Sequence, residues 1–304
     1  MDTHHHHNHH HHHHHEISAS MSKIFIFCIA LNLLFVGIET VVGLLYNSVG
    51  LLSDAGHNLS DVFSLVLVLV AFRMSKAAST PQFTYGYKKA TILISLINAL
   101  ILLVAVGAII IESIYKLKNP QPISGTAISW TAGVGILING LTTWLLMGGS
   151  KQDINVKGAY LHMLMDTLVS VGVVVSGIII SYTEWVWIDP VIGIVLAIII
   201  MFSTYNLLKE SLLMTLDAVP SSVDKEHIIE DLRNYNKIES WHHLHIWAIS
   251  TTDVAATIHI VIKDLNDMEN VKTEVREIFH KSGVHHCTIE TETAGTECQA
   301  YSCK

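Results

Sequence analysis

Charged residues are scarce in this sequence, since only 14% of its 304 residues are Asp, Glu, Lys or Arg. A soluble domain carries about 25%. The formal net charge is −8, and no cluster of Lys and Arg is long enough to bind nucleic acid, so we expect no nucleic-acid partner. Cysteine is also scarce: Cys28 lies in an apolar run, and Cys287, Cys298 and Cys303 lie near the C-terminus. This distribution excludes a secreted disulfide scaffold.

A secretory signal peptide is not expected, because polar histidines precede the first apolar run and no cleavage pattern follows it. Residues 4–7 and 9–15 hold 11 of the 21 histidines. Two interpretations of this run stay open. It is either a purification tag placed before a native start at Met21, or a flexible tail that collects metal ions weakly.

Long apolar runs fill most of the sequence, and hydrophobic residues make up 50% of it. A helix of about 20 apolar residues crosses a bilayer core of about 30 Å. Six runs reach that length, and turn-forming residues separate them. They cover residues 23–46, 51–75, 88–114, 124–147, 156–182 and 187–208. The sequence therefore predicts a six-helix membrane bundle over residues 21–208, with a His-rich segment over residues 1–20 before it.

Lys and Arg are distributed unequally over the flanks of these runs. With the N-terminus inside, the inner flanks hold Lys23, Arg73, Lys76, Lys88, Lys89, Lys151, Lys157 and Lys209, and the outer flanks hold Lys116 and Lys118. The positive-inside rule then predicts that both termini are cytoplasmic.

Two apolar runs contain the same ionisable element, His-x-x-x-Asp. The second run has it as His57 and Asp61, and the fifth as His162 and Asp166. Side chains four residues apart lie on one face of a helix, and ionisable groups inside a bilayer mark function by default. A single pair could be a structural hydrogen bond, but two identical pairs on different helices predict a meeting of two imidazoles and two carboxylates. Such a set suits tetrahedral Zn²⁺.

The same ligands predict coupling to protons. Imidazole binds a metal only when it is neutral, and carboxylate only when it is ionised, so metal and protons compete. We therefore expect Zn²⁺, or its chemical relatives Cd²⁺ and Co²⁺, to leave the cytoplasm in exchange for protons. Ligand chemistry alone does not choose among these ions.

Other polar groups in the first run have simpler interpretations. Asn32 is typical of a hydrogen bond between helices. For Glu39, a place on the cation path and a contact between helices both stay open.

Residues 209–304 have ordinary charge density and read as a separate soluble domain. We expect helix 223–235, capped by Ser221 and Ser222, then strands 238–249 and 254–262, helix 268–280 and strand 285–293. This αββαβ order predicts an open α+β sheet with helices on one side. Histidines at 242, 243, 245, 259, 285 and 286, with Glu290, Glu292 and two terminal thiols, favour a second metal site here.

Four stretches resemble the cation diffusion facilitator family, in particular its bacterial zinc, cadmium and cobalt efflux branch. They are SDAGHNLSD at residues 53–61, FTYGY at 83–87, NVKGAYLH at 155–162 and HHLHIW at 242–247. The resemblance implies a multi-pass protein of the cell's inner membrane. It also implies a homodimer whose ferredoxin-like cytoplasmic domains meet, and a transport site of His57, Asp61, His162 and Asp166.

The resemblance further implies a cytoplasmic zinc site of structural or regulatory role. Its ligands would fall on His242, His259 and Glu292, with Cys298 and Cys303 as further candidates. The sequence departs from the family in two places. The loop at residues 148–156 lacks the long His-rich insertion of many eukaryotic members, and Glu290 and Glu292 stand where some members have His and Asp, which leaves the number of ions open.

Three other classes of function suit these residues less well. A membrane metalloenzyme needs an open coordination position and a general base, as in His-Glu-x-x-His, and this motif does not occur, so no enzymatic activity is expected. A passive channel would trap an ion held by four ligands. A metal sensor would not need ligands inside two membrane runs.

Overall fold

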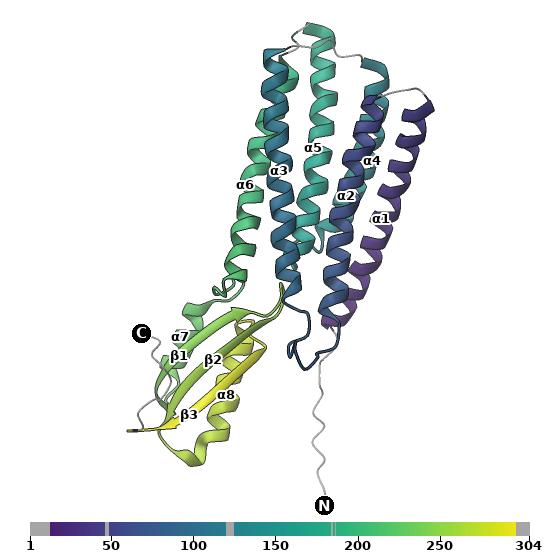
Figure 1. Ribbon diagram of the computed structural model, residues 1–304. Coiled ribbons are helices and arrows are strands. Elements are labelled where there is room, and N and C mark those ends of the chain that lie inside the picture. Colours follow the sequence, from purple (N-terminus) through teal and green to yellow (C-terminus); the bar gives the residue numbers. More distant parts are fainter. Residues whose placement is uncertain (1–12, 46–48, 120–124, 184, 186, 296–304) are drawn as a thin grey trace, which may run out of the picture. The chain divides into compact units, whose positions relative to one another are not determined.

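The computed structural model describes residues 13–45, 49–119, 125–183, 185 and 187–295. Six long helices come first (Figure 1): α1 (His13–Leu45), α2 (Val49–Ser75), α3 (Ala90–Lys118), α4 (Gly125–Met147), α5 (Ile154–Thr183) and α6 (Ile188–Thr215). They overlap the six predicted runs, of which residues 46 and 124 lie outside the described residues. By its internal contacts the chain forms two compact units, residues 1–73 with 101–204, and residues 74–100 with 205–304.

Three stretches of the described chain are long and apolar enough to cross a membrane, namely Met21–Val42, Ala90–Lys118 and Pro190–Thr215. They lie in α1, α3 and α6. Helix α4 contains a shorter apolar stretch, Gly133–Met147. Helices α2 and α5 carry the polar His-x-x-x-Asp elements. Three candidate spans therefore support the prediction of a membrane part, and the predicted total of six membrane spans stays a prediction.

The first unit is a helical bundle with a polar seam inside an apolar core. Its core includes Phe25 of α1, Leu65 of α2, Leu146 of α4 and Met163 of α5, all fully buried. Asn32 of α1 donates a hydrogen bond to the Thr142 hydroxyl of α4 over 3.1 Å, which confirms its predicted role between helices. The outer faces of the helices are apolar, with exposed Leu45, Val104, Ile111, Leu137 and Phe202. Exposed apolar side chains in such number are typical of contact with lipid.

The last helix of the bundle ends later than predicted. Helix α6 continues to Thr215, past the expected end at residue 208, because Lys209 and Glu210 are good helix formers. Asp217 follows with a φ of 59°, and the Ala218 amide donates back to the Leu213 carbonyl over 3.0 Å. A left-handed residue with such a backward bond is a common helix end.

The second unit contains the predicted αββαβ domain. Its elements are α7 (Lys225–Asn234), β1 (Ile238–Ala248), β2 (Val254–Ile262), the short 3₁₀ helix η1 (Leu265–Asp267), α8 (Met268–Lys281) and β3 (His286–Thr293). The sheet order is β1-β2-β3, with β1 antiparallel and β3 parallel to β2. The prediction of the helix cap was wrong. Asp224 caps α7, accepting the His227 amide over 3.0 Å, while the Ser221 hydroxyl donates to Glu210 instead.

Alternation along β2 separates the two faces of the sheet. Ile258 and Ile260 are fully buried and pack with Leu232 of α7 and with Val275 and Phe279 of α8. His259, between the two isoleucines, therefore lies on the opposite face, because successive strand side chains point to opposite sides. The helices cover one face, and the histidines lie on the other.

The segment before α3 is held to this domain within the second unit. Lys88 pairs with Asp253 at 3.0 Å in the β1–β2 turn, and the Thr251 amide of the same turn donates to the Thr91 hydroxyl over 3.1 Å. Lys89 pairs with Asp217. The turn that joins β1 and β2 is therefore fixed against the first turn of α3.

Candidate metal sites

The first candidate site lies between α2 and α5. Asp61 is on the buried face of α2, and His162 and Asp166 are one helical turn apart on the buried face of α5. The Nε2 atom of His162 lies 2.7 Å from Oδ1 of Asp61 and 3.9 Å from Oδ2 of Asp166. One ligand atom from each residue lies within 4.8 Å of the others. Three of the four predicted ligands therefore come together.

The fourth predicted ligand, His57, has a backbone position in α2 one turn before Asp61. Its side chain lies outside the described residues, so its part in the site remains a prediction.

A second polar contact lies directly beside this position. The Asn58 amide of α2 donates to Oε2 of Glu39 in α1 over 2.7 Å, and both side chains are buried. Of the two interpretations left open for Glu39, the structure shows the contact between helices. Asn58 follows position 57 directly, so this hydrogen bond ties α1 to the part of α2 that carries the site.

The chemistry of the first site is that of a cation binder. Its two carboxylates and one imidazole are between 0% and 6% exposed, and burial of carboxylates is costly unless a positive charge compensates for them. Imidazole nitrogen and carboxylate oxygen are both ordinary Zn²⁺ ligands at about 2.0–2.2 Å. Ligand atoms on one tetrahedral zinc lie about 3.3 Å apart, so the distance of 2.7 Å would widen and that of 3.9 Å would shorten when the three atoms bind one ion.

The second candidate site lies on the open face of the sheet. Strand register pairs His242 of β1 with His259 of β2, and His259 with Glu290 of β3. The Oε1 atom of Glu292 lies 2.9 Å from Nδ1 of His259 and 3.3 Å from Nε2 of His242. The predicted ligands His242, His259 and Glu292 therefore form one cluster.

Two further residues border this cluster. The Nε2 atom of His259 lies 3.2 Å from Oε2 of Glu290, so the ring of His259 stands between two carboxylates. His243 lies in a bulge of β1, with its ring 5.1 Å from that of His242 and 5.0 Å from that of His259. The density of histidine and glutamate in the sequence indicated both Glu290 and His243. Period-two alternation from His242, however, would have placed His243 on the helix-covered face of the sheet. Cys298 and Cys303 lie outside the described residues.

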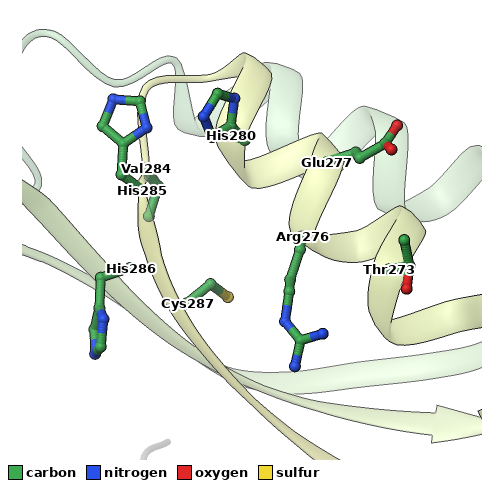
Figure 2. A pocket seen from close by; sticks show the side chains of 8 residues that line it. All are labelled: Thr273, Arg276, Glu277, His280, Val284, His285, His286 and Cys287. Carbon is green, nitrogen blue, oxygen red and sulfur yellow. The ribbon is translucent and has the colours of Figure 1, made fainter. Parts of the chain in front are cut away.

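A separate hollow of about 420 Å³ lies between α8 and the start of β3, and Figure 2 shows the side chains that line it. The rings of His280 and His285 lie 4.7 Å apart at its rim, and Cys287 and Arg276 line it as well. Burial raises the pKa of the Cys287 thiol from 9.0 to about 12, although the Arg276 guanidinium lowers it. A protonated thiol is a poor ligand. Among the described residues, groups of three potential ligands occur only in the two clusters above.

The chain matches known proteins over most of its length. A family model described as the cation efflux transmembrane domain matches residues 25–215, and one described as the cation efflux protein, cytoplasmic domain, matches residues 220–294. The chain is 35% identical over 261 residues to a "Cadmium, cobalt and zinc/H(+)-K(+) antiporter" of Bacillus subtilis, covering 84% of each chain. It is 34% identical to the metal cation efflux system protein CzcD of Cupriavidus metallidurans, covering 88% of this chain and 86% of that one. It is 32% identical to zinc transporter ZitB of Escherichia coli, covering 85% and 83%.

Proposed function

We propose, because this chain belongs to the cation diffusion facilitator family, that it exports Zn²⁺ from the cytoplasm in exchange for protons. The observation that carries the proposal is the buried contact of Asp61 with His162, next to Asp166, between two long helices. Cd²⁺ and Co²⁺ are the alternative ions. Support comes from the names of the relatives. The Bacillus subtilis relative is named as an antiporter of cadmium, cobalt and zinc, and the Escherichia coli relative is named as a zinc transporter.

The proposed architecture has six membrane spans. Helices α2 and α5 would cross the bilayer with α1, α3, α4 and α6, because each of the six has at least 23 residues, enough for a core of about 30 Å. The excess of Lys and Arg on one set of flanks supports cytoplasmic termini. The location would be the inner membrane of a bacterium, with a membrane domain at residues 21–208 after the His-rich segment 1–20.

The C-terminal domain, residues 209–304, would be the cytoplasmic part and would have the ferredoxin-like fold. The matching family model is named for a dimer and for the cytoplasm. We propose that two copies of this chain associate through it as a homodimer.

The transport step follows from competition at the first site. On the cytoplasmic side, Zn²⁺ would displace protons from Asp61, His162, Asp166 and, as the fourth ligand, His57. Four protein ligands leave no open position for chemistry, which suits a site that holds and releases its cargo. After the helices rearrange, protons from outside would return to the same nitrogen and oxygen atoms and release the ion. Each ligand is thus both a metal ligand and a proton carrier.

A resident zinc ion would occupy the second site. The Oε1 atom of Glu292 lies 2.9 Å from Nδ1 of His259 and 3.3 Å from Nε2 of His242. These distances are close to the spacing of about 3.3 Å between two ligand atoms of a tetrahedral zinc. The other nitrogen of His259 would donate to Glu290, as metal-bound histidines commonly do to a carboxylate. The bound ion would stabilise the sheet. Cys298 and Cys303 remain candidates as further ligands of this ion.

Purified protein in sealed vesicles tests the transport proposal. With a fluorescent zinc indicator inside the vesicles and a pH indicator in parallel, an outward proton gradient should drive saturable Zn²⁺ uptake, and uptake should move protons the other way. The same measurement with Cd²⁺ and Co²⁺ ranks the ions. Zinc uptake without proton movement, at every imposed gradient, would contradict the proposed exchange.

A further inference from the structure

We propose that His243 is a fourth ligand of the ion in the second site, so that the site is a closed set of three imidazoles and one carboxylate. This inference rests on the proposed zinc site of His242, His259 and Glu292. It adds a residue that the sequence pattern alone would place on the opposite face of the sheet.

Strand β1 is irregular where His243 lies. His242 pairs with His259, and His245 pairs with Thr257, so three steps along β1 match two steps along β2. One residue is therefore extra, which is the definition of a β-bulge. Leu244 packs on the helix-covered core, so the extra residue is His243. A bulge frees a side chain from strict alternation and re-aims it.

The three histidine rings are evenly spaced. Their centroids are separated by 5.1 Å for His242 and His243, 5.0 Å for His243 and His259, and 5.2 Å for His242 and His259. Three imidazoles on one tetrahedral zinc, with Zn–N bonds of about 2.0–2.1 Å, have centroids about 5 Å apart. The three rings thus form a nearly equilateral triangle of the size that a shared ion requires.

The backbone at the bulge is in an unfavourable conformation. His243 has a φ of 50°, one of two positive values at non-glycine residues among the described part of the chain. The left-handed region is costly for a residue with a Cβ, and such conformations cluster where function maintains them. Glycine would adopt this backbone at no steric cost, and asparagine tolerates it. A metal bond to the imidazole gives a physical reason for histidine at this position.

Four protein ligands have a consequence for the role of the ion. A zinc site with three protein ligands and a water is open to exchange, whereas a four-ligand site is typical of a structural ion. The ligands come from all three strands, since His242 and His243 are on β1, His259 on β2 and Glu292 on β3. The ion would therefore join the whole sheet.

The test compares variants of the full chain in detergent. All of these variants share the membrane site and the N-terminal histidines, so a difference in zinc binding between them comes from the substituted residue. His243→Asn removes the imidazole and keeps a residue that tolerates a positive φ. His245→Asn is the matched control, because its ring lies 6.3 Å from that of His243 on the same strand. Zinc affinity is measured by competition with a chromophoric chelator, and thermal unfolding is measured with zinc and with EDTA.

We expect His243→Asn to weaken the tightest zinc binding by on the order of 100-fold, since loss of a mere supporting contact already costs about 10–100-fold. His245→Asn should bind as wild type does. In EDTA, His243→Gly should unfold at the wild-type temperature or above it, because the strained backbone relaxes, but zinc should raise that temperature less than in wild type. A merely structural role for His243 would not produce this zinc-dependent difference.

Wild-type zinc affinity in His243→Asn, together with loss of binding in His242→Ala and His259→Ala, would overturn the proposal and leave the three-ligand site in place. Unchanged binding in all three of these variants would instead overturn the proposed second site itself, and the fourth ligand with it.

Discussion

Replacement of Asp61 by asparagine removes one negative charge from the first site and changes little else. The side chain is 1% exposed, and its Oδ1 atom lies 2.7 Å from His162 Nε2. Asparagine keeps the size and can still form a hydrogen bond with the imidazole, so the helices should pack as before. The cation, however, would lose an anionic ligand in a site that is buried between the helices.

The magnitude follows from the cost of leaving a buried charge uncompensated. Breaking a buried ion pair by removal of one partner costs about 3–5 kcal/mol, and about 1.4 kcal/mol corresponds to a factor of ten in affinity. We therefore expect Asp61→Asn to weaken Zn²⁺ binding at the transport site by about two to three and a half orders of magnitude. Uptake at micromolar zinc should then fall to near background.

The assay is zinc uptake into sealed vesicles under a fixed proton gradient, over a series of zinc concentrations. Glu112→Gln is the matched control, since it makes the same chemical change at an exposed residue of α3 that pairs with Lys116 at 3.0 Å. Exposed ion pairs contribute about 0–1 kcal/mol, so this control should transport normally. If Asp61→Asn transports zinc within about threefold of wild type, while the control is also normal, Asp61 is not a ligand of the cargo.

Two further predictions concern the C-terminal domain. A pKa of about 12 keeps the Cys287 thiol protonated at pH 8. Because only the thiolate reacts, alkylation of Cys287 in native protein should be roughly a thousandfold slower than that of a thiol with a pKa of 9.0. The alkylation rate should increase as the pH rises toward 12. Mass spectrometry of the labelled peptide, with denatured protein as the reference, measures the rate, and rapid native labelling at pH 8 would contradict the buried environment. Phe279→Ala should destabilise the sheet domain by about 3–5 kcal/mol, because the ring is fully buried and its loss leaves a cavity. Amide exchange in β1–β3 should accelerate accordingly, whereas the exposed Leu265→Ala should change it little.

The helices and strands followed closely from local sequence patterns. Runs of about 20 apolar residues coincide with α1 to α6, and β2 has the predicted bounds, because apolar length and period-two alternation act over neighbouring residues. The errors also have local causes. Ser221 and Ser222 were expected to cap α7, but the carboxylate of Asp224 accepts the hydrogen bond of the free His227 amide, since Asp224 directly precedes the first turn of α7.

The first site was predictable for a different reason. Charged groups in an apolar helix are costly, so Asp61, His162 and Asp166 are conspicuous in the amino-acid sequence, and the i, i+4 spacing put the α5 pair on one face. Spacing says nothing about which helix faces which. Only packing of α2 against α5 brought Asp61 to His162, although the two residues are 101 positions apart.

The sequence by itself determined that imidazoles and carboxylates are concentrated in two apolar runs and in one short domain, because composition and spacing are local properties. The tertiary structure alone decided which of them share a site. Strand register paired His259 with Glu290 and placed Glu292 two residues along β3 on the same face, where its carboxylate lies 2.9 Å from His259. The bulge in β1 turned His243 toward the same point. Pairing between distant segments and a break in alternation depend on hydrogen bonds that no local pattern specifies.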